Sequence, residues 1–137
     1  MTLETDLRRW YELWNEQDRQ GWLDHWRSFA PGEPTLEDPV GTPLKRGWDL
    51  AGELWDRTGR NALKVVITSL ITGGDEAVVV CHNEGTFRGE PLVIPSVDVW
   101  KVRSDGTSAV RSFWEIPEQI PYGRWTASTG ERGVTAS

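Results

Sequence analysis

The hydrophobic residues near the start of the chain recur at the period of an α-helix. Leu3, Leu7, Trp10 and Trp14 follow one another at spacings of four, three and four residues, which places their side chains on one helical face. The residues between them are mostly polar or charged. This pattern predicts an amphipathic first helix over residues 3–14.

Two shorter helices are predicted after the first. Apolar residues return at helical spacing from Trp22 and stop at Phe29, just before a Pro-Gly-Glu-Pro run at residues 31–34. Proline removes a backbone donor and disfavours helix in the residue before it, so the second helix is predicted to end near Phe29. Residues 35–37 suit a brief extended segment, and residues 48–55 suit a third helix.

The second half of the chain changes to the pattern of β-strands. Its segments are rich in β-branched and aromatic residues, and turns that contain glycine separate them. The predicted strands cover residues 63–71, 77–87, 91–102 and 109–116. Helices followed by hairpin-connected strands are typical of an α+β fold in which helices cover one face of a curved sheet.

The length and charge of the chain narrow the class of protein. With 137 residues we expect a single domain over residues 1–120, followed by a polar tail over 121–137 that is partly disordered. The net charge of −6 argues against a nucleic-acid partner, because phosphate contacts need a clustered basic face. No apolar stretch approaches the ~20 residues of a membrane helix, and the first ten residues lack a signal-peptide core. We therefore expect a cytoplasmic protein.

Cysteine and histidine usage gives no sign of a metal centre. The single cysteine, Cys81, excludes an internal disulfide. His25 and His82 are too far apart in sequence for the usual spacing of zinc ligands. We expect neither a metal nor a cofactor.

The chain contains nine tryptophans, several times ordinary usage, which predicts a large apolar cavity, an interface or both. Both faces of the strand predicted over residues 91–102 are largely apolar. One face would form the core beneath the helices, and the face with Val93, Val97 and Val99 would need a partner. A homodimer through the sheet is the simplest partner.

Asp98 is the most informative ionisable residue, because it shares a strand face with Ile94, Ser96 and Trp100. A carboxylate on an inward apolar face loses hydration, which favours its neutral form and raises its pKa. A neutral carboxylic acid can donate a hydrogen bond. The alternative is that Asp98 lies on the outer face and pairs with a lysine or arginine of a neighbouring strand.

Asp38 is the second candidate, and Pro39 follows it directly. A carboxylate held by a following proline has little conformational freedom to lose, which suits a general base that must meet a carbon-bound proton at close range. The alternative is that Asp38 only opens an ordinary Asp-Pro turn.

From Trp10 to Trp114 the sequence resembles the ketosteroid isomerase branch of the nuclear transport factor 2-like (SnoaL-like) superfamily. The resemblance is carried by Glu37-Asp38-Pro39-Val40-Gly41, Val97-Asp98-Val99-Trp100 and Ser112-Phe113-Trp114. It implies a cone-shaped α+β barrel, with helices packed in a strongly bent antiparallel sheet around a deep apolar pocket, usually dimeric. In that family the residue matching Asp38 moves a proton between two carbons, and the residue matching Asp98 donates a hydrogen bond to the dienolate oxygen.

The chain departs from the family at the oxyanion tyrosine of the first helix. If the helix register is kept, this position is Trp10, and Tyr11 comes one residue later. Use of Tyr11 would turn Leu13 outward and Glu12 inward, so we place Trp10 in the site as its third catalytic residue. An indole N–H donates a hydrogen bond but matches a phenol poorly in reach and acidity.

The resemblance also assigns a substrate-binding wall, most of whose members are large and apolar. These positions are Trp14, Leu54, Val79, Cys81, Ile94, Ser96, Val110 and Trp114. Asn83 lies on the same strand face as Cys81 and adds a polar group that can orient a hydroxyl or carbonyl. The set suits a rigid, flat, hydrophobic small-molecule ligand, and the competing interpretation is that it is simply core.

The residues and the resemblance together predict a cofactor-free proton-transfer enzyme of the steroid delta-isomerase type, acting on a ketosteroid-like or other hydrophobic enolisable ketone. Two alternatives stay open. One is a non-catalytic protein that binds a steroid or another lipophile. The other is a different SnoaL-like reaction, such as polyketide cyclisation or epoxide hydrolysis.

Overall fold

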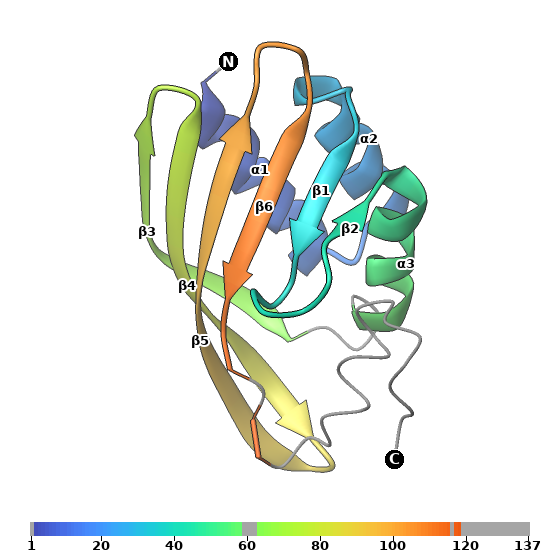
Figure 1. The fold of residues 1–137 in the computed structure, drawn as a ribbon. Helices are drawn as coiled ribbons and strands as arrows, with labels where there is room; N and C mark the ends of the chain where they lie inside the picture. The colour runs from blue at the N-terminus through green and yellow to red at the C-terminus, as the bar shows by residue number, and fades with distance from the viewer. Residues whose placement is uncertain (1, 59–62, 116, 119–137) are drawn as a thin grey trace.

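The computed structural model describes residues 2–58, 63–115 and 117–118. Three helices in this part of the chain gather against one face of a strongly curved six-stranded sheet, as Figure 1 shows. This is the predicted α+β architecture, with the helices packed in a bent sheet. The predicted tail, residues 121–137, lies outside the described residues.

The three helices form where the helical spacing of apolar residues predicts them. They are α1 (Leu3–Asn15), α2 (Arg19–Phe29) and α3 (Trp48–Thr58). The Thr2 side chain caps α1 by accepting from the backbone N–H of Thr5, and Asp18 caps α2 by accepting from that of Gly21. No helix in the described ranges is long and apolar enough to cross a membrane.

The strands also lie close to their predicted positions. They are β1 (Pro34–Glu37), β2 (Lys45–Arg46), β3 (Lys64–Gly73), β4 (Glu76–Phe87), β5 (Glu90–Val102) and β6 (Ser108–Phe113). The short strand β2 was not predicted. The turn between β4 and β5 has positive φ at both Arg88 (53°) and Gly89 (81°), the backbone that suits a two-residue hairpin.

The order of strands in the sheet is β2-β1-β6-β5-β4-β3, so the last strand, β6, lies near the middle. All neighbouring strands are antiparallel except β1 and β6, which run parallel with Leu36 opposite Val110 and Glu37 opposite Arg111. The predicted antiparallel sheet therefore contains one parallel pair. Because of this pairing, the residues that follow β1 lie beside the end of β6.

Most of the tryptophans gather in one aromatic core between the helices and the sheet. Trp22, Trp26 and Trp100 are fully buried, and Trp10 lies among them with ring centroids 4.9–5.5 Å away. Trp14, Trp48 and Trp55 complete the cluster. The unusual tryptophan content is therefore largely core packing.

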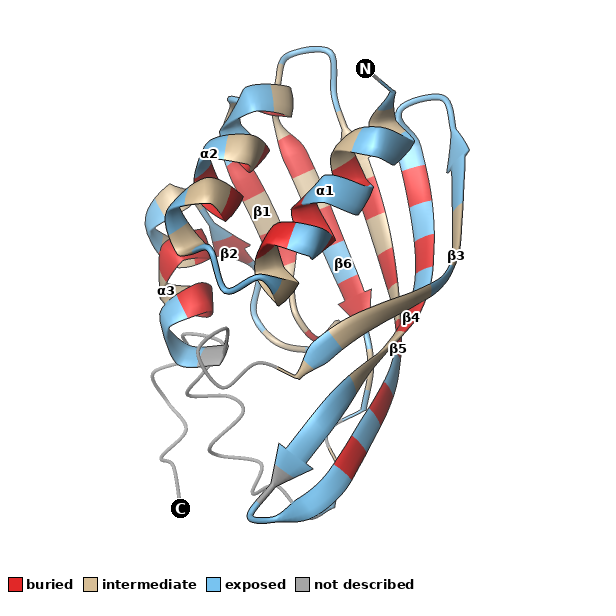
Figure 2. Ribbon diagram, turned by 180° about the vertical axis from the view of Figure 1, so that it is seen from behind, coloured by how far each residue is buried: buried red, intermediate tan, exposed pale blue. Residues whose placement is uncertain are grey.

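The two faces of β5 differ in exposure as the alternation predicts. The face with Ile94, Ser96, Asp98 and Trp100 is buried, and the opposite face is more exposed, as the alternating colours in Figure 2 show. Apolar side chains on that outer face form a continuous group, because Val80 pairs with Val97 and Val97 pairs with Phe113. We call this group the outer-face patch: Val78, Val80, Val93, Val97, Val99 and Phe113.

Candidate active site

Asp98 lies at the centre of the inner face of the sheet. It occupies β5 between Val79 of β4 and Ser112 of β6, and only 8% of its surface is exposed. Both carboxylate oxygens accept short hydrogen bonds. Tyr11 Oη donates to Oδ2 at 2.5 Å, and Ser112 Oγ donates to Oδ1 at 2.5 Å. The inward placement of Asp98 expected from the sequence is therefore what the structure has, and the outward alternative is wrong.

Tyr11 of α1 faces Asp98 from the opposite side of the core. Its side chain is buried, and its hydroxyl oxygen also accepts a hydrogen bond from Trp100 Nε1 at 3.1 Å. Trp100 therefore orients the phenol while the phenol donates to Asp98. A fixed phenol next to a buried carboxyl is an arrangement in which both groups can donate to one negatively charged oxygen.

The expectation that Trp10 takes this place is wrong as a matter of geometry. Trp10 packs among the other tryptophans, and its indole N–H has no hydrogen-bond partner in the described part of the chain. Leu13 remains buried and Glu12 exposed, so Tyr11 faces the sheet without any shift of register. The reason is that α1 packs against both α2 and the sheet, so its buried face is wide enough to include both Trp10 and Tyr11.

Asp38 directly follows β1 and is held by the end of β6. Trp114 Nε1 donates to Asp38 Oδ1 at 2.6 Å. Two residues on, the backbone N–H of Val40 donates to the backbone carbonyl of Ser112 at 2.7 Å. The segment is thus fixed to β6 by a side-chain and a backbone contact, which a simple surface turn would not require.

Burial raises the pKa values of both carboxyl groups. For Asp98 burial is the largest cause, partly offset by the hydrogen bonds from Ser112 and Tyr11, and the pKa rises from 3.8 to about 6. The negative charge of Asp38 adds a smaller increase, so the two groups interact. The pKa of Asp38 is also raised by burial, against the lowering effects of the Trp114 hydrogen bond, the Lys45 charge and Ser112.

The pKa of Tyr11 is raised well above 10, first by burial and then by the charge of Asp98. Tyr11 therefore keeps its proton at every physiological pH and remains a donor. Asp98, with a pKa of about 6, is the member of the pair that changes charge in the neutral range.

Most of the predicted wall residues belong to one of two clusters of packed hydrophobic side chains. Most pack in the main core, namely Trp14, Leu54, Val79, Cys81 and Val110. Ile94 and Trp114 belong to a second, smaller group with Leu63 and Leu92. Trp14 packs against Trp55 and Trp22 between the helices.

A short polar row continues along β4 and β5 beyond Asp98. Ser96 is buried, and its hydroxyl oxygen accepts a hydrogen bond from Asn83 Nδ2 at 3.0 Å. Cys81 Sγ lies 3.2 Å from the same oxygen. Burial raises the pKa of the Cys81 thiol to about 11, so this cysteine stays protonated.

The two histidines lie away from the carboxylates. His82 contacts Glu84 on the outer face at 3.0 Å, and His25 contacts the backbone carbonyl of Asp6 at 2.8 Å. Within residues 2–58, 63–115 and 117–118 no group of three or more His, Cys, Asp and Glu side chains is placed to hold a metal ion.

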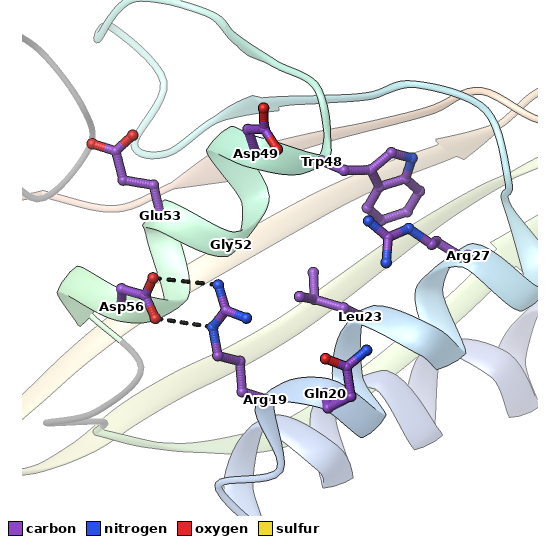
Figure 3. Close-up of a pocket in the computed structure, with 9 residues that line it drawn as sticks. All are labelled: Arg19, Gln20, Leu23, Arg27, Trp48, Asp49, Gly52, Glu53 and Asp56. Atoms are coloured by element: carbon purple, nitrogen blue, oxygen red, sulfur yellow. Dashed lines mark hydrogen bonds and ion pairs between the residues drawn. The ribbon is translucent and has the colours of Figure 1, made fainter.

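A polar groove of about 340 Å³ lies on the outside of the helices, between α2 and α3. Figure 3 shows its lining, in which Arg19 pairs with Asp56 and the Arg27 guanidinium lies over the Trp48 ring at 4.6 Å. None of the candidate catalytic residues lines it. The groove is therefore separate from the carboxylate site.

Three residues of the site were not predicted from the sequence: Tyr11, Trp100 as its donor, and Ser112. A signal for Ser112 was present, because it alternates with Val110 and Trp114 and must share their inward face. No comparable signal exists for the Trp100 contact, since it joins residues 89 positions apart.

Comparison with known proteins identifies a family for most of this chain. The sequence model of the SnoaL-like domain matches residues 7–111. No curated protein matches the sequence.

Several solved structures share the fold. One is SalBIII, an epoxide hydrolase/cyclase-like enzyme with a role in pyran ring formation in the polyether salinomycin. Its sequence is 21% identical to this one, and the match covers 82% of this chain and 90% of SalBIII with a TM-score of 0.70. A second is a putative SnoaL-like polyketide cyclase from Jannaschia sp. CCS1, which is also 21% identical. The match covers 80% of this chain and 85% of the cyclase with a TM-score of 0.55. A third is a computationally designed 17-OHP binder, which is 17% identical. The match covers 82% of this chain and 89% of the binder with a TM-score of 0.65.

Proposed function

Because this chain belongs to the SnoaL-like family of the nuclear transport factor 2-like superfamily, we propose that it is a cofactor-free enzyme that moves a proton on a hydrophobic, enolisable ketone. The observation that carries the proposal is the buried hydrogen bond between Tyr11 and Asp98, with the second carboxylate, Asp38, near enough to affect the pKa of Asp98. We propose a ketosteroid-like substrate because most of the wall residues assigned by the resemblance are apolar.

In this mechanism Asp38 is the general base. Its carboxylate removes a proton from the carbon next to the substrate carbonyl, and the electron pair of the C–H bond moves into the conjugated system and onto the carbonyl oxygen. Asp38 then returns the proton to a second carbon, which shifts the C=C bond and regenerates the carboxylate. The hydrogen bond from Trp114 holds the base in one position throughout.

Tyr11 and Asp98 stabilise the negative oxygen formed between the two proton transfers. Tyr11 donates its phenolic proton in a hydrogen bond, and Asp98 donates when it is protonated. In the free protein both Tyr11 and Ser112 donate to Asp98 instead. A substrate oxygen that takes over the donation from Tyr11 leaves Asp98 with one donor fewer, which favours its protonated form.

The experiment is an ultraviolet assay of the conversion of a β,γ-unsaturated to an α,β-unsaturated ketosteroid. Loss of the base in Asp38→Asn should lower kcat by ~10² to 10⁴. Loss of one oxyanion donor in Tyr11→Phe should lower kcat by ~10² to 10³. Trp10→Phe, the matched control in the same helix, should lower stability while leaving turnover per folded molecule within about threefold. Wild-type turnover no faster than that of Asp38→Asn would exclude the isomerase.

Two further measurements, of steroid binding and of epoxide opening, separate the remaining alternatives. If steroid binds, as followed by tryptophan fluorescence, and no conversion occurs, the protein is a binder, which the fold shared with the designed 17-OHP binder allows. If epoxide substrates are opened instead, the protein is an epoxide hydrolase, and the fold it shares with the epoxide hydrolase/cyclase-like enzyme SalBIII allows this alternative.

A further inference from the structure

We propose that Ser112 is a positioning residue that sets the charge state of Asp98 and joins the two carboxylates of the site into one unit. Only the effect of this role on turnover depends on the proposed function. Its physical basis is independent, because it depends on contacts that the free protein already makes.

The first contact is with Asp98. Ser112 lies directly opposite Asp98 in the β5–β6 register, on the inner face, with 9% of its surface exposed. Its hydroxyl donates to Asp98 Oδ1 at 2.5 Å, within the range of a charge-assisted O–H···O⁻ bond. A hydroxyl that donates to a carboxylate favours the charged form of that carboxylate.

The second set of contacts is with the Asp38 segment. The Ser112 backbone carbonyl accepts from Val40 N–H at 2.7 Å, and the Ser112 side chain lowers the pKa of Asp38. Trp114, two residues after Ser112 and directly after the end of β6, donates to Asp38 Oδ1. The end of β6 therefore contacts both acidic residues, and Ser112 is the residue common to them.

The groups that face Asp98 come from every element packed around it. They are Tyr11 of α1, Cys81 of β4, Trp100 of β5 through Tyr11, Ser112 of β6 and Asp38 after β1. Tyr11 keeps its proton, and Cys81, whose pKa is about 11, remains neutral. Ser112 and Tyr11 are thus the donors that oppose the effect of burial on Asp98.

The sign of the effect follows from these contacts. Removal of the Ser112 hydroxyl withdraws one donor from the charged form of Asp98 and weakens the support of charged Asp38. Both pKa values should rise, and that of Asp98 should rise more, because it loses a direct hydrogen bond. For Asp98 we expect an increase of roughly one to two pH units, the shift that corresponds to one hydrogen bond to a charged group.

The test is a ¹³C NMR titration of the aspartate carboxyl carbons in the full chain, with Asp98→Asn used to assign the Asp98 resonance. In Ser112→Ala the Asp98 midpoint should move upward by that amount. In Ser112→Thr, which keeps the hydroxyl, it should stay near the wild-type value. Ser112→Cys, a weaker donor of similar size, should give an intermediate midpoint and covers the case in which the alanine variant does not fold.

An unchanged Asp98 midpoint in both Ser112→Ala and Ser112→Cys would overturn the inference. Because the titration does not depend on turnover, it tests the role of Ser112 independently of the isomerase proposal. Where turnover is observed, both limbs of the pH profile of Ser112→Ala should move to higher pH and Ser112→Thr should restore them. Loss of amplitude without movement of either limb would also overturn the inference, since general damage to the fold gives that result.

Discussion

At the scale of single residues, the buried carboxyl group of Asp98 has a raised pKa, and its charged form lowers the stability of the folded protein. Its pKa is about 6 in the folded protein and near 3.8 when exposed, so the folded state holds a proton more tightly than the unfolded state. The associated stability is fully present below about pH 3.8 and is lost as the pH rises through about 6.

Asp98→Asn should therefore stabilise the protein at neutral pH, because asparagine is neutral and keeps the shape of the side chain. The expected gain is up to about 3 kcal/mol at pH 8, vanishing near pH 4. Urea unfolding at the two pH values measures it. Asp105→Asn is the control, since Asp105 is exposed, and it should show no gain at pH 8. An equal gain for Asp98→Asn at both pH values would contradict the assigned cause.

The same residues show how far sequence reasoning reaches. Alternation along β5 and the surrounding apolar residues favoured an inward Asp98 with a raised pKa, but they left an outward position open as an alternative. They were not enough to choose between Trp10 and Tyr11, because both lie on the broad buried face of α1. That choice depends on which wall of the core each side chain meets, and this is a property of packing between distant elements.

At the scale of elements, local signals account for the ends of the helices. The side chain of Asp18 accepts from the backbone N–H of Gly21 at 2.9 Å and begins α2. Asp18→Ala should therefore lower the free energy of unfolding by about 1 kcal/mol. Asp24→Ala, an exposed change within the same helix, is the matched control and should have a smaller effect. Chemical denaturation of the two variants measures the difference, and equal losses would show that Asp18 has no special capping role.

Pairing between strands was harder to predict than the strands themselves. The four long strands follow from alternation and from the glycine-containing turns between them. The parallel contact of β1 with β6 joins residues more than 70 positions apart, and nothing near Leu36 or Val110 signals it. This pairing nevertheless places Asp38 beside the end of β6. Family resemblance was therefore enough to predict the candidate residues, but local sequence patterns were not enough to predict that they lie together.

At the scale of the whole molecule, the outer-face patch leaves one side of the sheet apolar. Val93 is 60% exposed, and Val78, Val80 and Phe113 are each about 40% exposed. The Arg111–Glu37 ion pair lies beside the patch, since Arg111 is opposite Val99 in the β5–β6 register. A second copy related by a two-fold axis would cover the apolar centre, and we propose a homodimer of this kind.

Val97→Lys should convert this dimer into a monomer, because it places a charge at the centre of the patch. Leu44→Lys is the control, since Leu44 is also exposed and apolar but lies outside the patch. Light scattering after size exclusion should give twice 15.5 kDa for the wild type and for Leu44→Lys, and 15.5 kDa for Val97→Lys. A wild-type mass of 15.5 kDa at micromolar concentration would exclude the dimer.

The place of β6 in the sheet also bears on how the protein is made. The ribosome makes β6 after the other five strands in the described part of the chain, yet β6 must insert between β1 and β5, which leave the exit tunnel before it. Until it does so, the early segment around Asp38 has neither Trp114 nor the Ser112 carbonyl to hold it. The segment around Asp38 therefore reaches its fixed position only after Trp114 has been made, 76 residues after Asp38 itself.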